Sequence, residues 1–201
     1  MTNYTADRSF TNYVHDELVV PQIYKKELDW VIKDINPDAL EAMDIQNGID
    51  YVLTDVNNKD IYIQERFRDV FYQKYNDATI RYRRDNNLNP TRVQSEFYKI
   101  KADYLVYGIT NGKKFLDKRH TLTGFIKWVV IDLNFLREKF KNNLIKITKD
   151  SRTTCYMSDD ILCCPENYNP DGSSSFTPLD VTLLHQLWGS EVIYKQFGYF
   201  Y

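Results

Sequence analysis

The apolar positions in the first part of the chain follow the spacing of a helix. From Phe10 to Leu18 they recur about every four residues, which predicts a helix over residues 7–20. Pro21 interrupts or restarts this helix, and the helical spacing then continues to about Asp34. An Asn-Pro-Asp break at residues 36–38 follows it.

A tight two-stranded hairpin is predicted after this break. Gly48–Leu53 and Ile61–Arg68 are rich in β-branched and aromatic residues, and residues 55–60 between them have the composition of a turn. Asp50 opens the first strand, and the cluster Gln64-Glu65-Arg66 lies near the end of the second. The hairpin therefore places a carboxylate beside an acid, an amide and a cation.

Three further elements are predicted before residue 112. Residues 78–83 alternate as a strand, residues 91–102 have a helical spacing with Pro90 suited to the first turn, and residues 104–109 form an apolar strand. The order is helix, three strands, helix, strand. A helix between the last two strands suits a crossover to a parallel neighbour. We therefore predict an α/β fold with a mixed central sheet flanked by helices.

A C-terminal elaboration is expected beyond this core. Its predicted elements are a strand over 125–133, a helix over 134–143 capped by Asn134, short strands over 145–148 and 153–157, a polar loop over 164–175, and a helix over 179–187 with Pro178 at its start. We expect one domain over residues 1–201, in which residues 113–201 pack on a core formed by residues 1–112.

Composition favours a folded protein of the cytoplasm. The chain has 201 residues, of which 43% are hydrophobic, enough for a sizeable core. Its apolar runs are all shorter than a membrane span, and residues 1–10 lack the apolar stretch of a signal peptide. Three cysteines, two of them adjacent, do not suggest a disulfide framework. We therefore expect a reducing compartment and no membrane partner.

Charge is distributed unevenly, although the formal net charge is only −2. Residues 1–65 carry 5 basic and 13 acidic side chains, whereas residues 66–119 carry 13 basic and 6 acidic ones. The basic block begins at Arg66, where the hairpin cluster ends. A local positive field is what a phosphate backbone requires, and a solvated surface with clustered charges is the competing interpretation.

The hairpin residues are suited to binding a divalent metal ion and a phosphate group. Alternation along the second strand puts Gln64 and Arg66 on one face, and Glu65 with Ile63 on the other. Gln64 and Arg66 would then share a site with Asp50. Carboxylate and amide oxygens bind Mg²⁺, and an arginine neutralises phosphate but cannot act as a general base.

This arrangement resembles the PD-(D/E)XK, or restriction-endonuclease-like, nucleases. Their core has the order helix, three strands, helix, strand, and their signature is an Asp at the start of one hairpin strand and an acid-x-Lys at the end of the next. The resemblance covers residues 7–109 and implies Mg²⁺ or Mn²⁺ held by Asp50 with Gln64 or Glu65. It also implies Arg66 as the cation of the catalytic site.

The chain departs from that signature at three positions. Gln64 replaces the usual acid, Arg66 replaces the usual Lys, and Glu65 stands where a hydrophobic residue is expected. A small bulge would bring Glu65 to the metal in place of Gln64, and the two alternatives stay open at this stage.

Further basic residues, and one acid, are candidates for supporting roles. DNA-binding positions are predicted at Arg68, Arg81, Arg83, Lys99 and Lys101, and the resemblance implies Glu17 on the first helix as a supporting acid. Solvated salt bridges are the competing interpretation for these charges.

The sequence thus favours a metal-dependent DNA endonuclease or exonuclease, a hydrolase of phosphodiester bonds. The alternative is a catalytically inactive protein of the nuclease fold that binds DNA or a protein partner, as a factor of a phage or mobile element. A homodimer is left open in both cases.

Overall fold

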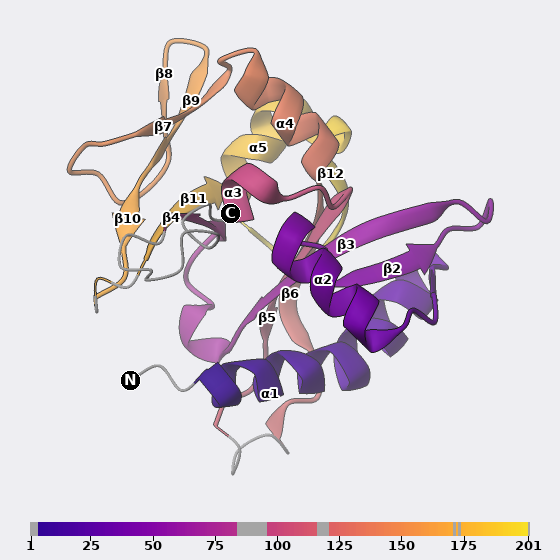
Figure 1. The fold of residues 1–201 in the computed structure, drawn as a ribbon. Coiled ribbons are helices and arrows are strands. Elements are labelled where there is room, and N and C mark those ends of the chain that lie inside the picture. The colour runs from indigo at the N-terminus through magenta and orange to yellow at the C-terminus, as the bar shows by residue number, and fades with distance from the viewer. Residues whose placement is uncertain (1–3, 84–95, 116–120, 171, 173, 201) are drawn as a thin grey trace.

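A six-stranded mixed sheet lies at the centre of the computed structural model, which describes residues 4–83, 96–115, 121–170, 172 and 174–200 (Figure 1). In chain order the helices and strands are α1 Tyr4–Val14, η1 His15–Leu28, β1 Val31–Ile32, α2 Pro37–Asn47, β2 Tyr51–Thr54, β3 Asp60–Arg68, η2 Val70–Tyr72, β4 Asp77–Arg83, α3 Glu96–Lys99, β5 Tyr104–Thr110, β6 Phe125–Asp132, α4 Leu133–Lys141, β7 Ile145–Thr148, β8 Tyr156–Ser158, β9 Ile161–Pro165, β10 Asn167–Tyr168, β11 Ser175–Asp180, α5 Val181–Trp188, η5 Gly189–Glu191 and β12 Ile193–Phe197. The predicted α/β class with a mixed sheet is confirmed.

The strand order in the central sheet is β1-β2-β3-β5-β6-β12. The hairpin β2–β3 is antiparallel, β3 and β5 are parallel, and β5–β6 and β6–β12 are again antiparallel. The chain beyond residue 112 therefore supplies two strands of the same sheet as the hairpin.

The predicted third strand forms but does not join the hairpin. β4 pairs with β11 in a separate three-stranded sheet with β10, and the parallel neighbour of β5 is β3. The expected crossover to a parallel strand is thus present, but it connects β3 with β5. Of the connecting helix predicted over residues 91–102, Glu96–Lys99 is helical in α3, residues 100–102 are not helical, and residues 91–95 fall outside the described ranges.

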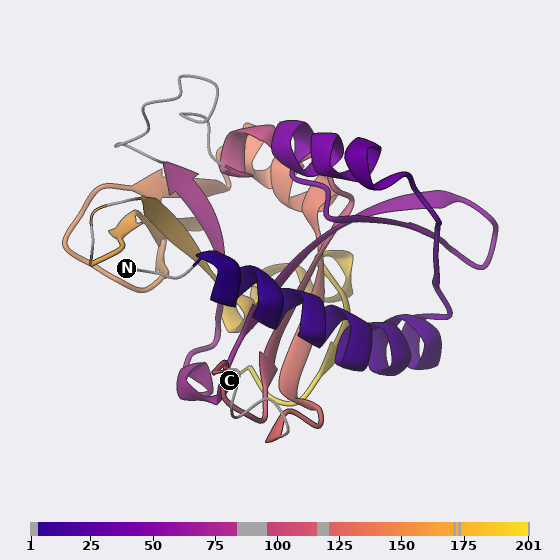
Figure 2. The same cartoon turned by 60° about the horizontal axis from the view of Figure 1, so that its bottom comes forward.

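The N-terminal helical segment covers one face of the sheet (Figures 1 and 2). α1 continues directly into η1, which has π-helical i→i+5 geometry and contains Pro21. The helical pattern was expected to reach Asp34, but η1 ends at Leu28, where Asp29 adopts a left-handed conformation. The following residues instead form the edge strand β1 beside β2.

The opposite face carries α4, α5 and the two small sheets. Its helices begin at aspartates: Asp132 Oδ1 accepts from Phe135 N, and Asp180 Oδ1 accepts from Leu183 N. The expected cap Asn134 therefore lies inside α4. Pro178, expected at a helix start, lies in β11, because Asp180 two residues later is the residue that caps α5.

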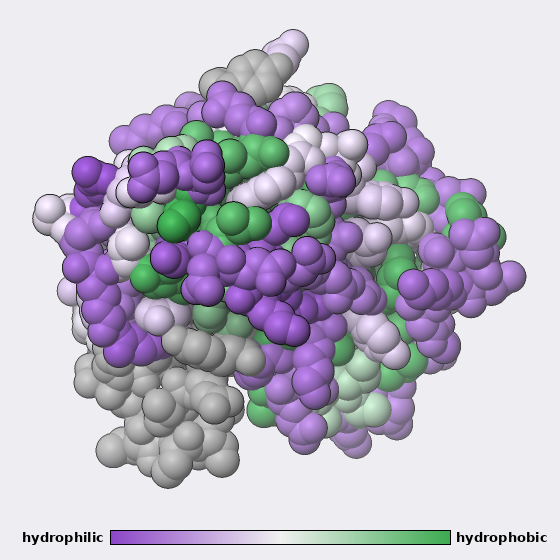
Figure 3. All heavy atoms as spheres, turned by 90° about the horizontal axis from the view of Figure 1, so that it is seen from above, coloured by the Kyte–Doolittle hydropathy of each residue, from purple (hydrophilic) through white to green (hydrophobic). Residues whose placement is uncertain are grey.

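Two apolar clusters sandwich the central sheet. One joins η1 and α1 to residues such as Ile63 and Val106, and the other joins α4 and α5 to residues such as Leu105 and Ile131. Seen from above, the surface is mainly hydrophilic and its hydrophobic side chains form smaller groups (Figure 3). Among the described residues, the helices are too short or too polar to cross a membrane.

The end of β12 offers a test of this packing. Gly198 has φ +73°, and a Cβ there would lie 2.5 Å from the carbonyl oxygen of Ile126. Gly189 has φ +53° but open space around a Cβ. We expect Gly189→Ala to lower the free energy of unfolding by about 1–3 kcal/mol, and Gly198→Ala to lower it further, as measured by chemical denaturation. Equal losses would contradict the close approach of the two strands.

Candidate functional site

The hairpin begins with a bulge that brings Asp50 onto the backbone of Glu65. The Asp50 N–H donates to the carbonyl of Ile63 (2.8 Å), although Tyr51 is the register partner of Ile63. Two successive residues therefore lie opposite one, as in a β-bulge. The Asp50 side chain then accepts a hydrogen bond from Glu65 N at 2.6 Å. Its carboxylate takes the place of a strand partner, in the plane of the sheet between its two faces.

The Glu65 carboxylate is buried beneath the helical segment. Its side chain has no exposed surface, and both oxygens contact His15 Nδ1, at 2.9 and 3.0 Å. The hydroxyl of Tyr24 donates to Oε1 at 2.5 Å. A buried carboxylate needs such partners, because desolvation of an unpaired charge is costly. Two groups from η1 thus tie the helical layer to β3.

Aromatic rings close this buried cluster. Tyr51 stacks on His15 with 3.7 Å between ring centroids and 5° between planes. Burial raises the pKa of Tyr24 well above its ordinary value, and the nearby Glu65 charge raises it further. The pKa of Tyr51 is also raised, first by burial and then by Glu65 and Asp50. Both phenols therefore stay protonated at physiological pH.

The other face of β3 presents Gln64 and Arg66, as the alternation predicts. Gln64 pairs with Leu105 and is 8% exposed, and within the described chain its Oε1 atom has no hydrogen-bond partner. Arg66 is half-buried and pairs with Tyr107 of β5. Burial raises the pKa of Tyr107 to about 12, against the opposing charges of Arg68 and Arg66. The positive charges of both guanidinium groups therefore lie close to this face of the sheet.

Arg68 continues the same face toward β4. Its guanidinium donates to Thr79 Oγ1 at 3.1 Å and lies 3.9 Å from the Asp77 carboxylate. Burial raises the pKa of Asp77 despite the opposing charge of Arg68. The contact therefore holds β3 against the second sheet in addition to placing positive charge there.

Most of the remaining predicted binding residues have structural contacts. Arg83 makes a bidentate ion pair with Glu166, in which Nε donates to Oε1 at 2.9 Å and Nη2 donates to Oε2 at 2.7 Å. Lys99 Nζ donates to the carbonyls of Ile45 and Asp44 at the C-terminal end of α2. Arg81 is half-buried opposite Phe176 of β11. The contacts of Arg83 and Lys99 stabilise the packing of neighbouring elements.

The other two predicted residues are exposed. Lys101 lies between α3 and β5, and Glu17 lies on η1. The side chains of His15 and Tyr24 in the helical segment hydrogen-bond to Glu65, and Glu17 is exposed. The signal that could have indicated His15 is its place beside Val14 on the apolar stripe of the helix.

The side chains around Asp50 meet only part of what Mg²⁺ requires of its ligands. In the described ranges, no three His, Cys, Asp or Glu side chains gather closely enough to hold a metal ion. Mg²⁺, however, is commonly bound through one or two carboxylates, with waters and substrate phosphates completing its shell. The oxygen donors available here are the Asp50 carboxylate, which is bonded to the backbone of Glu65, and Gln64 Oε1, which has no partner within the described chain.

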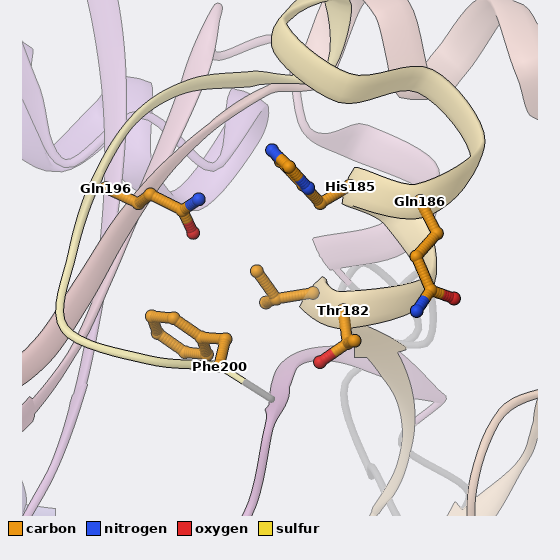
Figure 4. Close-up of a pocket in the computed structure, with 6 residues that line it drawn as sticks. Thr182, His185, Gln186, Gln196 and Phe200 are labelled. Carbon is orange, nitrogen blue, oxygen red and sulfur yellow. The ribbon is translucent and has the colours of Figure 1, made fainter.

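A separate pocket, which does not involve the hairpin, lies between α5 and the end of β12 (Figure 4). Its volume is about 160 Å³, and His185 and Gln196 point toward one another across it. His185 and Gln186 are exposed, and none of the hairpin residues lines this pocket. The candidate site at Asp50 is thus formed by strands and not by this depression.

Comparison with known proteins yields no match to a family model, to a curated protein or to a solved structure.

The buried cluster can be tested through Tyr24. Tyr24→Phe removes a donor to a buried carboxylate, and we expect a loss of about 1–3 kcal/mol in the free energy of unfolding. Tyr194→Phe is the matched control, because that ring is 50% exposed. Denaturation in urea measures both. A Tyr24→Phe protein as stable as wild type would show that Glu65 does not depend on this hydroxyl.

The Arg83–Glu166 pair predicts a pH dependence. Burial alone would raise the pKa of Glu166, but hydrogen bonds from Arg83 and Ser175 outweigh it and lower the pKa below its ordinary 4.5. A lowered pKa means stability that is present above pH 4.5 and lost as the pH falls through the folded-state value. Glu166→Gln should therefore be less stable than wild type at neutral pH, and the difference should narrow in acid.

The matched control for this series is Asp159→Asn. Asp159 is exposed with φ +53°, a conformation that asparagine tolerates. Its stability difference from wild type should stay constant over the same pH range. A difference for Glu166→Gln that does not change with pH would contradict the ion pair.

Proposed function

We propose that this protein is a metal-dependent nuclease of the PD-(D/E)XK type that hydrolyses phosphodiester bonds in DNA. The observation that carries the proposal is the hydrogen bond that joins the Asp50 carboxylate to the backbone of Glu65, between Gln64 and Arg66 on β3. There, a carboxylate, a buried amide oxygen without a partner among the described residues and a half-buried arginine come from two adjacent strands.

The order of elements adds support. A helical segment precedes the hairpin, and a parallel strand, β5, follows on the far side of β3. The nuclease core has the same succession, although here β4 belongs to a second sheet.

In this proposal Asp50 and Gln64 hold Mg²⁺ or Mn²⁺. The metal, when bound, lowers the pKa of a bound water and polarises the phosphate. Gln64 is preferred to Glu65 as the second ligand, because both Glu65 oxygens already contact His15. Glu65 instead positions Asp50 through its backbone N–H. Arg66 neutralises charge on the phosphate and keeps its proton throughout.

A second candidate function is a non-catalytic binding factor built on the same fold. The observation that favours it is the small number of acids: Glu65 is engaged by η1, and the described chain has no cluster of three metal-ligating acids or histidines. Such a factor would bind DNA or a protein partner without metal-dependent chemistry.

Cleavage of plasmid and single-stranded DNA with Mg²⁺ or Mn²⁺ tests the proposal. Asp50→Asn keeps an oxygen to accept the Glu65 N–H but removes the charge that binds the metal. We expect its cleavage rate to fall by about 100-fold or more, since even indirect partners of a metal contribute 10- to 100-fold. Asp159→Asn, which is exposed and distant in the chain, is the control and should cut like wild type.

Calorimetric titration of Mn²⁺ into the wild type and Asp50→Asn separates the two candidates. Metal binding that is lost in the variant, together with loss of cutting, supports the nuclease. No cutting and no metal binding by a folded wild type would overturn the nuclease proposal and favour the binding factor.

A further inference from the structure

An exposed group of aromatic rings and lysines lies immediately beyond the end of β3. Its members, which we call the aromatic–lysine patch, are Phe71, Tyr72, Lys74, Tyr75 and Lys113. All three aromatic residues are well exposed, at 59% for Phe71, 42% for Tyr72 and 43% for Tyr75. Large aromatic side chains grouped on a surface indicate a binding site more often than single exposed ones do.

Each ring of the patch has a cation beside it. Lys113 Nζ lies 5.2 Å from the centroid of Phe71, and Lys74 Nζ lies 5.1 Å from that of Tyr75. The guanidinium of Arg68 lies 4.6 Å from the centroid of Tyr72. The Tyr72 and Tyr75 rings are themselves 6.1 Å apart. Positive charge and flat apolar surface are therefore interleaved.

The backbone beneath the patch is held in place by Asp69. This carboxylate is 6% exposed and accepts from Phe71 N at 3.1 Å and from Lys114 N at 3.2 Å. Val70 N donates to Gly112 O at 3.1 Å. These bonds fix η2 against the turn after β5, at the same end of the molecule in both ribbon views (Figures 1 and 2). The patch is therefore formed by two segments that backbone and side-chain hydrogen bonds hold together.

The charge of these two segments has one sign. Residues 70–76 and 111–115 contain three lysines and no Asp or Glu. The acids that flank residues 70–76 are Asp69, which is buried beneath them, and Asp77, which is half-buried and lies 3.9 Å from Arg68. The local positive charge favours a polyanionic partner over a neutral one.

We propose that the aromatic–lysine patch binds single-stranded nucleic acid, with bases stacked on its rings and phosphates beside its lysines. A duplex presents phosphates but keeps its bases stacked inside, so the exposed rings would contribute little to binding it. Sequence-independent single-strand sites combine the same two elements, stacking platforms and a positive groove.

The patch also extends the candidate site. Arg68 touches Tyr72 and lies two residues from Arg66 on the same face of β3. From Gln64 to Arg68 the strand rises about 13 Å. A strand bound on the patch would thus lead toward Asp50. The claim that the bound strand is the substrate rests on the proposed nuclease function. The claim that the patch binds single-stranded nucleic acid does not.

The test measures binding without catalysis. Fluorescence anisotropy with labelled oligo-dT in EDTA compares wild type, Phe71→Ala, Tyr75→Ala and the matched control Tyr194→Ala. Tyr194 is equally exposed but packs on Tyr104 at the opposite end of the sheet strands. We expect each patch variant to weaken binding by about 5- to 150-fold, and the control to bind like wild type.

The lysines give an independent readout. Lys74→Gln and Lys113→Gln should each make the dependence of log affinity on log salt shallower by about 0.7, the value for one single-strand phosphate contact. Asp50→Asn should bind oligo-dT normally, so that loss of cleavage and loss of binding are distinguished.

Three outcomes would overturn the proposal. The first is that wild type does not bind oligo-dT at low salt. The second is that a hairpin duplex binds as tightly as oligo-dT and is weakened equally by Phe71→Ala. The third is that a patch variant binds the oligonucleotide like wild type but has a different mass in solution. The last would identify a surface for self-association. Circular dichroism checks that the variants, whose altered side chains are exposed, remain folded.

Discussion

The buried carboxylate of Glu65 is the constraint on which the arrangement of the hairpin depends. Its side chain is fully enclosed, so it must be satisfied by His15 and Tyr24, and these two residues position η1 on β3. Its backbone N–H in turn engages Asp50. One residue therefore links the helical layer, the second strand of the hairpin and the acid that opens the first. A substitution that displaces any one of these three parts would therefore alter the positions of the other two.

β3 separates two different chemical environments because its side chains alternate. Beneath the helical layer, acid, histidine and phenol groups form a sealed hydrogen-bonded cluster around Glu65. On the opposite face, Gln64 presents a neutral amide, and Arg66 and Arg68 carry positive charge, with Arg68 contacting β4 and η2. Asp50 lies between the two, in the plane of the sheet. The two faces of β3 thus differ in charge: the buried carboxylate lies on one, and the two arginines lie on the other.

Local patterns predicted the elements well where one physical cause dominates. The hairpin, β5 and β6 follow from runs of β-branched and aromatic residues, and the placement of Gln64 and Arg66 opposite Glu65 follows from the two-residue period of a strand. Patterns failed where tertiary contacts compete. β4 has the composition expected of a third strand, yet it pairs with β11, a partner about 95 residues later in the chain. Arg83 and Lys99 are basic residues of the predicted kind, but their partners Glu166 and Ile45 lie far from them in sequence.

The sequence by itself determined the class of fold, the hairpin and the residues that face one another across it, because these depend on neighbours within a few positions. It also determined where the basic block begins, at Arg66. Only the tertiary structure decided that His15 and Tyr24, rather than Glu17, meet Glu65, because the π-helical geometry of η1 changes which side chains face the sheet. It alone decided that Phe71 and Lys113 lie together, since a backbone bond between Val70 and Gly112 joins segments that the sequence keeps about 40 residues apart.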